Sequence, residues 1–381
     1  MDVPFEVYNV YAQSVELELT EPMALSFGTV TSRPSGWLTM SCDVDGRPVV
    51  GHGEGATLPQ AVFTDDCGPN IAGNMRSLVR AVHADTNKTV GGALDSVQAH
   101  RFRDGGRYPT ARLAVEMAIL DAATRASGIS MKEVIGVPAD ITEVPYGKSI
   151  GGATAGAILR QAEEALDNNA RKIKIKVSPK LFDSVTVAID VLQREQTNVD
   201  IMVDANGGFD PTSAEDLRMI EKLDDCGLLM IEEPVSRVGE IRGLDAVRAL
   251  HRALPNLTTT ICLDDCLQTF EDCQTALDER LAHIINVKPG RIGSFLQAIR
   301  LVDLATSKHA EVMVGGMLEA TPGRAMTTLL GAYCLHKGCT IPGDLSLAQE
   351  RLTEDFVSPA KQLRLSPRGG IIVPSGPGWG F

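Results

Sequence analysis

The chain has 381 residues, of which 44% are hydrophobic and 22% are charged, and its formal net charge at pH 7 is -13. These proportions are typical of a folded protein with a large core, and the length accommodates a barrel together with a smaller domain. The negative charge argues against nucleic acid or an anionic membrane as a partner, because both select for basic surfaces.

The start of the chain lacks the features of a secretory signal. Met1-Asp2-Val3-Pro4 has no basic residue, and no long apolar segment follows it. The sequence has no apolar run long enough to span a bilayer. The eight cysteines include no Cys-x-x-Cys pair, which is typical of reduced thiols. We therefore expect a cytoplasmic protein, with zinc at Cys262 and Cys266 as a minor alternative because no histidine lies at ligand spacing.

Residues 5–55 are predicted to form β-structure. Apolar residues alternate partly over residues 7–19, and residues 37–44 and 48–55 flank Asp45-Gly46, a dipeptide typical of a hairpin turn. Residues 23–36 between them are rich in Ser, Thr and Gly. We expect these residues to form a surface loop or a mobile lid that closes on a ligand.

A helix is predicted over residues 110–127. Leu113, Met117 and Leu120 are spaced i, i+4 and i+7, and alanine fills many of the other positions. Gly136-Val137-Pro138 then marks a domain boundary.

After this boundary, short strands alternate with helices. The predicted strands are residues 144–150, 172–177, 200–204, 228–232, 260–264, 284–288, 311–314 and 339–342, and helices are predicted at 155–168, 213–223, 295–308 and 324–335. Strands that recur every roughly 25 to 30 residues with helical crossovers indicate parallel βα units. About eight such units indicate a barrel rather than an open sheet. The irregular tail from residue 363 is expected to fold back onto the first domain.

Charged side chains end several of these strands, which is where barrel enzymes place their active-site groups. In chain order the strand ends carry Lys174 and Lys176, then Asp204, Glu232, Asp264 and Lys288. The alternation in Lys-Ile-Lys-Ile-Lys, residues 172–176, puts three lysines on one face, and for a strand taken alone a solvated edge is the ordinary explanation. Three carboxylates at the ends of the next strands favour a functional explanation instead.

Three neighbouring carboxylates without a cation of their own are expensive to bury. A divalent cation removes this cost, because three carboxylates with water and a substrate oxygen satisfy the octahedral, all-oxygen preference of Mg²⁺ or Mn²⁺. We therefore predict that Asp204, Glu232 and Asp264 bind such an ion.

The same ion gives the lysines a role. Adjacent cations lower the pKa of a lysine, so Lys176, near Lys174 and the ion, can act as a neutral base. Lys288 would face Lys176 across the substrate. Two bases on opposite faces of one carbon are what a racemase requires.

These motifs resemble the enolase superfamily, and within it the muconate-lactonising subgroup with its N-acylamino-acid racemases and o-succinylbenzoate synthases. The barrel motifs are Lys174-Ile-Lys176, Asp204-Ala-Asn206, Ile231-Glu232-Glu233-Pro234, Leu263-Asp264-Asp265, Lys288-Pro-Gly-Arg291 and Gly315-Gly316-Met317-Leu318-Glu319. The resemblance covers nearly the whole chain, including Ser26-Phe27-Gly28-Thr29, Gly53-Glu54, Leu120-Asp121-Ala122 and Pro377-Gly378.

The resemblance implies a modified TIM barrel, (β/α)7β, over residues 139–362. Residues 1–138 would form an α+β capping domain with a substrate-specificity loop, and residues 363–381 would return to that domain. The resemblance also implies a small-molecule carboxylate substrate, a Mg²⁺ cofactor with Mn²⁺ as a substitute, and a homo-oligomer.

The resemblance further assigns roles to individual residues. Asp204, Glu232 and Asp264 would be the metal ligands, Lys176 and Lys288 the acid–base pair, and Lys174 the group that stabilises the developing enolate. Asn206 and Asp265 would support the ligands from behind. The residues implied to contact the substrate are Ser26, Phe27, Ser149, Gly316, Met317 and Glu319.

Three positions depart from the pattern of these relatives. Asp265 stands where relatives usually have Glu, and Cys266 where they often have Ser, so the contacts behind Lys288 are expected to differ. Thr321-Pro322 follows Glu319 where relatives are rich in glycine. Because proline fixes φ and removes a donor, we expect a reshaped pocket wall there.

We therefore expect an enzyme that removes the proton α to a carboxylate, with preorganised charge holding the enediolate. Racemisation of an N-acylated amino acid and synthase-type dehydration are favoured, with muconate-type cycloisomerisation and dipeptide epimerisation as alternatives. A Schiff-base aldolase would leave the three carboxylates unexplained. A non-catalytic metal-binding barrel remains an alternative of a different functional class, because fold does not fix function.

Overall fold

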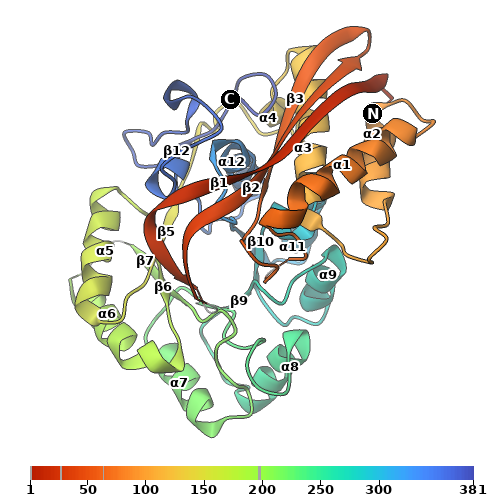
Figure 1. Ribbon diagram of the computed structural model, residues 1–381. Helices are drawn as coiled ribbons and strands as arrows, with labels where there is room; N and C mark the ends of the chain where they lie inside the picture. Colours follow the sequence, from red (N-terminus) through yellow and green to blue (C-terminus); the bar gives the residue numbers. More distant parts are fainter. Residues whose placement is uncertain (1, 26–27, 63, 196–198) are drawn as a thin grey trace.

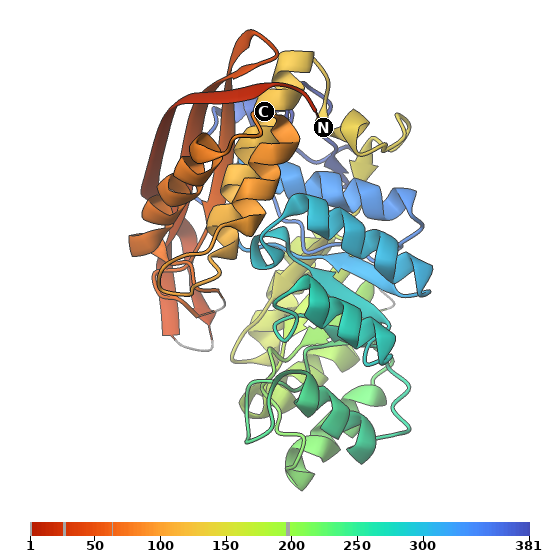
Figure 2. The same ribbon diagram turned by 90° about the vertical axis from the view of Figure 1, so that its right-hand side faces the viewer.

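The computed structural model describes residues 2–25, 28–62, 64–195 and 199–381. The N-terminal third packs a three-stranded sheet against helices, and the rest of the chain curls into a barrel of parallel strands surrounded by helices (Figure 1). Seen from the side, the N-terminal sheet stands at one end of the barrel (Figure 2).

The N-terminal sheet is antiparallel, with the order β1 (Phe5–Leu25), β2 (Gly28–Val44) and β3 (Arg47–Ala56). Asp45 and Gly46 turn between β2 and β3 with φ of 54° and 74°, the left-handed conformation that a two-residue hairpin turn needs. This confirms the predicted hairpin.

The loop predicted over residues 23–36 is wrong for the residues that the structure describes, because they continue β1 and β2. Pairs such as Glu18 with Ser32 and Val15 with Ser35 extend the ladder into this Ser- and Thr-rich stretch. Backbone pairing with a neighbouring strand thus outweighs a composition typical of loops. Ser26 and Phe27 lie outside the described residues.

The helices of this part are α1 (Gly68–Ala84), α2 (Val90–Ala99), α3 (Pro109–Ser127) and α4 (Met131–Val134). The predicted helix at 110–127 is therefore confirmed as α3. It packs so closely on β3 that a Cβ atom at Gly53 would lie 1.9 Å from the carbonyl oxygen of Ala114. Glycine is required here because the two backbones touch.

Seven parallel strands form the barrel in the order β11-β10-β9-β8-β7-β6-β5. Their bounds are β5 (Gly147–Ile150), β6 (Lys172–Lys176), β7 (Asp200–Asp204), β8 (Ile231–Glu232), β9 (Ile261–Leu263), β10 (Ile284–Val287) and β11 (Glu311–Val314). Each of the first seven strands predicted beyond the boundary contains or overlaps one of these.

Helices cover the outside of the barrel (Figure 1). They are α5 (Ala155–Asp167), α6 (Phe182–Arg194), α7 (Ala214–Asp224), α8 (Gly243–Ala253), α9 (Phe270–Asp278), α10 (Pro289–Ile292), α11 (Phe295–Ser307) and α12 (Thr321–His336). Single 3-10 turns occur at η1 (Pro179–Leu181), η2 (Ala348–Glu350) and η3 (Pro359–Lys361). Hydroxyl side chains of Thr154, Ser213, Thr269 and Ser294 accept backbone hydrogen bonds at the starts of α5, α7, α9 and α11, which fixes where these helices begin.

The eighth strand predicted at residues 339–342 is wrong. Pro342 has no N–H to donate, so a ladder cannot run through this segment. Instead, Gly343 accepts from the amide of Gly147 at 2.7 Å, and the amide of Asp344 donates to Val314 at 2.9 Å. These two backbone contacts close the barrel between β5 and β11.

The C-terminal tail lies against the N-terminal part (Figure 2). In it, β12 (Ile371–Ile372) pairs with β4 (Glu143–Val144), and the fully buried Trp379 donates from its indole nitrogen to the carbonyl of Met117 on α3 at 3.0 Å. The domain bounds at 138 and 362 stay predictions.

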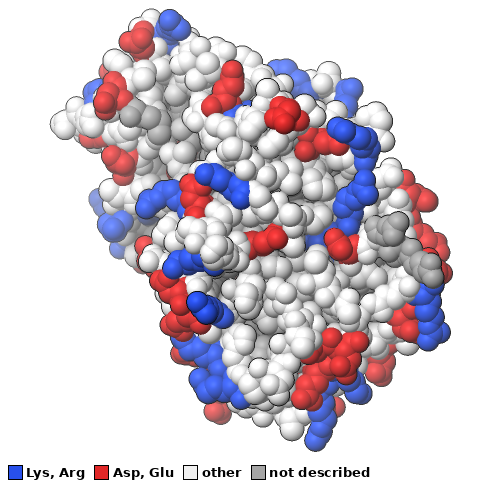
Figure 3. Space-filling view, turned by 180° about the vertical axis from the view of Figure 1, so that it is seen from behind, with Lys and Arg blue, Asp and Glu red and all other residues white. Residues whose placement is uncertain are grey.

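The surface mixes both signs of charge. On the face opposite that of Figure 1, the described lysines and arginines are interleaved with aspartates and glutamates around a broad uncharged area (Figure 3). Among the described residues, no helix has the length and apolar character needed to cross a membrane.

Candidate active site

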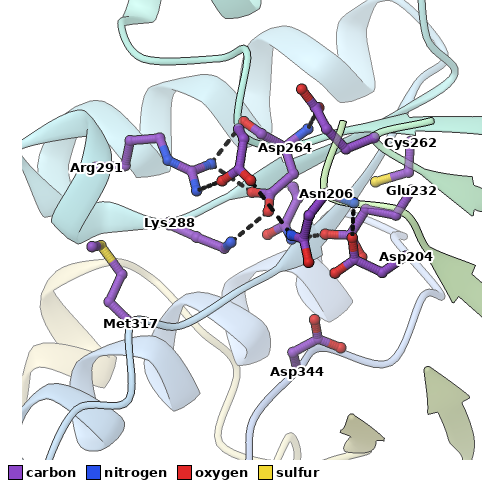
Figure 4. Close-up of polar contacts among 12 residues, drawn as sticks. Asp204, Asn206, Glu232, Cys262, Asp264, Lys288, Arg291, Met317 and Asp344 are labelled. Carbon is purple, nitrogen blue, oxygen red and sulfur yellow. Dashed lines mark hydrogen bonds and ion pairs between the residues drawn. The ribbon is translucent and has the colours of Figure 1, made fainter. Parts of the chain in front are cut away.

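The predicted strand-end residues meet at one end of the barrel. Register places Lys176 beside Asp204 and Asp204 beside Glu232, and Asp264 follows β9. The three carboxylates face a common region (Figure 4) and are at most 1% exposed. The parallel sheet therefore gathers the acids that the sequence separates by about thirty residues.

The lysines of β6 contact the first two carboxylates. Lys174 Nζ lies 3.1 Å from Asp204 Oδ2 and 3.0 Å from Glu232 Oε2. Lys176 Nζ lies 2.6 Å from the same Asp204 oxygen and donates to Asn206 Oδ1 at 2.7 Å. Although burial lowers the pKa of Lys174, the surrounding carboxylates, with Asp344 foremost, raise it well above its ordinary value. Lys174 is therefore a permanent cation in this arrangement.

Asp264 is held from the other side. Lys288 Nζ lies 2.5 Å from Asp264 Oδ2, while Arg291 bonds Asp264 Oδ1 at 2.5 Å and Asp265 Oδ1 at 2.7 Å. Burial raises the pKa of Asp264, but the charges of Arg291 and Lys288 outweigh burial and hold it well below its ordinary value. Asn206 Nδ2 lies 3.4 Å from Asp265 Oδ2, which links the two predicted supporting residues.

Glu232 carries the least compensated charge of the three. Asn286 Nδ2 donates to its Oε1 at 2.7 Å, and Lys174 bonds its Oε2. Burial, together with the negative charge of Asp204, raises the pKa of Glu232 to about 8. The site thus favours additional positive charge beside Glu232.

The shortage of positive charge beside Glu232 is relevant to whether the three acids could bind a metal ion. Among the residues that the structure describes, no three His, Cys, Asp or Glu side chains are arranged so that they could hold one. Lysine and arginine nitrogens instead occupy oxygens of Asp204, Glu232 and Asp264. The donor set itself, three buried carboxylates with too little positive charge at Glu232, fits a hard divalent cation. Binding such an ion requires the lysine contacts on Asp204 to lengthen.

The predicted acid–base pair approaches the carboxylates from two directions. Lys176 comes from β6 and contacts Asp204, whereas Lys288 follows β10 and contacts Asp264. Strands β7, β8 and β9 lie between them in the sheet. The side chain of Lys176 is 40% exposed and that of Lys288 is 13% exposed, so both amines remain more open than the carboxylates they touch.

The residues implied to contact a substrate are placed unequally. Ser149 lies at the end of β5, and its carbonyl accepts from Arg351 at 3.0 Å. Gly316 and Met317 follow β11, with Met317 on the Lys288 side of the cluster (Figure 4). Glu319 is 5% exposed and accepts from the amide of Met317 at 2.7 Å, so it belongs to the interior. Ser26 and Phe27 cannot be placed, because they lie outside the described residues.

The departures from the expected pattern are also placed. Thr321-Pro322 forms the first turn of α12, where a missing N–H costs no helical hydrogen bond. Cys266 Sγ lies 3.4 Å from Glu233 Oε2. Cys262 Sγ contacts only the carbonyl of Leu263, at 3.9 Å, among the described partners, and burial raises the pKa of both thiols.

Sequence reasoning gave no role to several residues that the structure brings into the site. Glu233 accepts from the amides of Asp264 and Cys266, at 2.7 and 2.9 Å, and so fixes the loop after β9. Arg291 and Asn286 hold carboxylates directly. Asp344 lies 2.5 Å from Lys174, and it was missed because it lies in an irregular segment, two residues beyond the segment predicted as the last strand.

Two family descriptions match the chain. "Mandelate racemase / muconate lactonizing enzyme, N-terminal domain" matches residues 7–136, and "Enolase C-terminal domain-like" matches residues 157–381. An o-succinylbenzoate synthase of Geobacillus stearothermophilus is 30% identical over 380 residues, which cover 98% of this chain and 92% of that protein. An N-succinylamino acid racemase of Amycolatopsis sp is 29% identical over 377 residues, which cover 98% and 94%.

Solved structures share the same arrangement. The substrate-liganded L-Ala-D/L-Glu epimerase of Bacillus subtilis superposes with a TM-score of 0.83 at 23% identity, over 98% of each chain. At this identity the similarity supports the fold alone, which is a barrel with a separate N-terminal sheet.

Proposed function

Because the chain belongs to the enolase superfamily, with the N-terminal domain of its mandelate racemase and muconate lactonizing branch, we propose that it removes the proton α to the carboxylate of a small substrate. The enediolate that results is then reprotonated or loses a leaving group. Membership confirms the predicted superfamily, the fold class and the expectation of an enzyme.

The observation that carries the proposal is the approach of Lys176 and Lys288 to the buried carboxylates from opposite ends of a run of three strands. A base that takes a proton and an acid that returns one must both reach the same carbon. Lys176 is our candidate for one face of that carbon and Lys288 for the other.

Lys174 has a different task in this proposal. Its carboxylate neighbours keep it charged, so it cannot serve as a base at neutral pH. A fixed buried cation instead stabilises negative charge that develops on the substrate carboxylate, because it needs no reorganisation when the charge appears.

The superfamily is metal-dependent, and we propose Mg²⁺, with Mn²⁺ as a substitute, as the ion held by Asp204, Glu232 and Asp264. When bound, such an ion supplies electrophilic stabilisation of the substrate carboxylate. Asn206 and Asp265 would keep the neighbouring side chains in place through their contacts with Lys176 and Arg291.

For the substrate, we propose an N-acylated amino acid that is racemised. Two-sided placement of the amines favours racemisation, since proton removal and return on opposite faces use both. Synthase-type dehydration is the second candidate, favoured by the 30% identity to an o-succinylbenzoate synthase. Dipeptide epimerisation and muconate-type cycloisomerisation remain alternatives. The homo-oligomer and the cytoplasmic location stay predictions.

Deuterium uptake tests this proposal. The protein is incubated in D₂O with Mg²⁺ and N-succinyl amino acids, dipeptides, succinylated cyclohexadienes or muconates, and exchange at the α-carbon is followed by NMR. Lys176→Ala and Lys288→Ala should each lose at least about 100-fold in exchange, the size of a general acid–base contribution. Lys180→Ala, which removes an exposed lysine from η1, is the matched control.

EDTA should abolish the exchange, and added Mg²⁺ should restore it. Exchange that persists at the wild-type rate in both lysine variants would refute the assignment of the bases. Exchange that ignores EDTA would refute the metal, and absence of exchange with every acid would favour the non-catalytic barrel.

A further inference from the structure

Asp344 joins two lysines of β6 from the segment that closes the barrel. Its Oδ2 lies 2.5 Å from Lys174 Nζ, and its Oδ1 lies 3.0 Å from Lys172 Nζ. The side chain is 12% exposed and points toward the carboxylate cluster (Figure 4). One carboxylate thus bridges two ammonium groups on the same face of one strand.

Lys172 has no part in the proposed chemistry, yet it is fully buried. Its Nζ lies 2.8 Å from Met313 Sδ, among apolar side chains of the barrel interior. A buried ammonium is expensive unless a carboxylate accompanies it. Among the described residues, Asp344 is the carboxylate that forms an ion pair with Lys172. The ion pair therefore holds Asp344 against the buried first residue of β6.

The backbone of Asp344 is fixed as well. Its amide donates to Val314 at 2.9 Å, and its carbonyl accepts from Arg324 Nη1 at 3.3 Å. A carboxylate held at its backbone and at one oxygen presents the other oxygen in a defined place. That place is beside Lys174.

The remaining partners of Lys174 are Asp204 and Glu232, both proposed metal ligands. A divalent cation on those two acids would repel the Lys174 ammonium, because like charges at contact distance repel strongly in a buried site. Asp344 is then the partner that can still hold it, since it is not among the proposed ligands.

We propose that Asp344, secured by Lys172, is a positioning residue that anchors the Lys174 ammonium and keeps it aimed into the site. The inference rests on the proposed role of Lys174. Asp344 itself touches neither the substrate nor the transferred proton in this scheme.

The test compares Asp344→Asn with the wild-type protein in two measurements. The first is residue-resolved acetylation with acetic anhydride, without metal or substrate, read by mass spectrometry. Loss of the anchor should raise the labelling rate of Lys174 at least about fivefold relative to Lys180, because the amine loses the shortest of its three carboxylate contacts and is reached more easily. Asp66→Asn removes another buried carboxylate, one that caps α3 at Thr110, and should leave Lys174 labelling unchanged.

The second measurement is deuterium uptake with saturating Mg²⁺. Misplacing one charged group lowers kcat by about 100-fold with little change in KM, because positioning acts on the transition state. Asp344→Glu keeps the charge but shifts it by one methylene, so kcat should stay at least about tenfold low. This variant also serves for labelling if Asp344→Asn fails to fold.

Wild-type labelling of Lys174 in Asp344→Asn, or full kcat in Asp344→Glu, would overturn the positioning role. If the wild-type protein exchanges no proton with any acid tested, the proposed function fails on its own. The acetylation measurement still decides whether Asp344 anchors Lys174.

Discussion

The N-terminal sheet is tied to the barrel through a buried carboxylate whose ionisation should control stability. Glu54 of β3 accepts from the amides of Ala320 and Gly323 at the start of α12, at 2.7 and 2.8 Å, and from Ser35 Oγ at 3.0 Å. It is 2% exposed. Burial raises its pKa from 4.5 to about 7, although the two amide contacts act in the opposite direction.

The sign of the effect follows from the pKa. Because the fold binds the proton more tightly than the unfolded chain, the stabilising contribution is complete below pH 4.5 and is lost as the pH rises through about 7. Between pH 5 and pH 8, ionisation of Glu54 should lower the free energy of unfolding by about 2 to 3 kcal/mol. Glu54→Gln should remove this loss.

Urea unfolding followed by circular dichroism at pH 5 and pH 8 measures the difference. Glutamine cannot accept from Gly323 through its NH₂ group, so the variant carries a loss of about 1 to 3 kcal/mol that does not itself depend on pH. This constant loss cancels when the two pH values are compared within one variant. Glu163→Gln, on an exposed turn of α5, is the control for loss of a carboxylate. Equal pH dependence in wild type and Glu54→Gln would refute the reasoning.

Three further predictions concern packing and metal binding. Gly53→Ala should destabilise the fold by at least about 1 to 3 kcal/mol in urea unfolding, because its Cβ would lie 1.9 Å from Ala114 O. Gly73→Ala, in an open part of α1, should instead stabilise it by about 0.5 to 1 kcal/mol; equal effects would contradict the close approach of β3 and α3. Trp379→Ala should cost about 3 to 5 kcal/mol in the same assay, since the indole is fully buried on α3, and a neutral result would show that the tail does not hold this helix. Mg²⁺ should raise the melting temperature and EDTA should reverse the rise, because an ion that binds only the fold stabilises it; an unchanged melting curve at millimolar Mg²⁺ would count against the proposed ligands.

Much of the barrel could be predicted from sequence because local and long-range signals agree there. The strands at residues 200–204 and 311–314 have the bounds predicted for them, since an apolar run ends in a charged or glycine-rich segment at each. The segment at 339–342 lacks this agreement, because Pro342 interrupts an apolar run that a parallel strand would need. The loop prediction for residues 23–36 is wrong for the opposite reason: a strand forms where none was predicted, because long-range pairing overrides a loop-like composition.

Strand-end reasoning also picked out carboxylates and lysines that the structure brings together. It could not reveal Arg291 as the partner of Asp264, because that contact depends on how a short helix after β10 turns back. Nor could it reveal that Glu233 fixes the next loop, since its hydrogen bonds with the amides of Asp264 and Cys266 depend on how that loop folds back. Glu232 is the last residue of β8 and pairs with Asp204, whereas Glu233 leaves the strand with a φ of 42°.

The closure of the barrel at Gly343 and Asp344 has a mechanical consequence. Six of the joints around the ring are ladders between neighbouring strands, whereas β11 and β5 are connected through two backbone contacts of a proline-bounded segment. A ring of strands with one weak connection is expected to open at that connection first. Backbone amides beside this joint should therefore exchange with solvent ahead of those in the ladders.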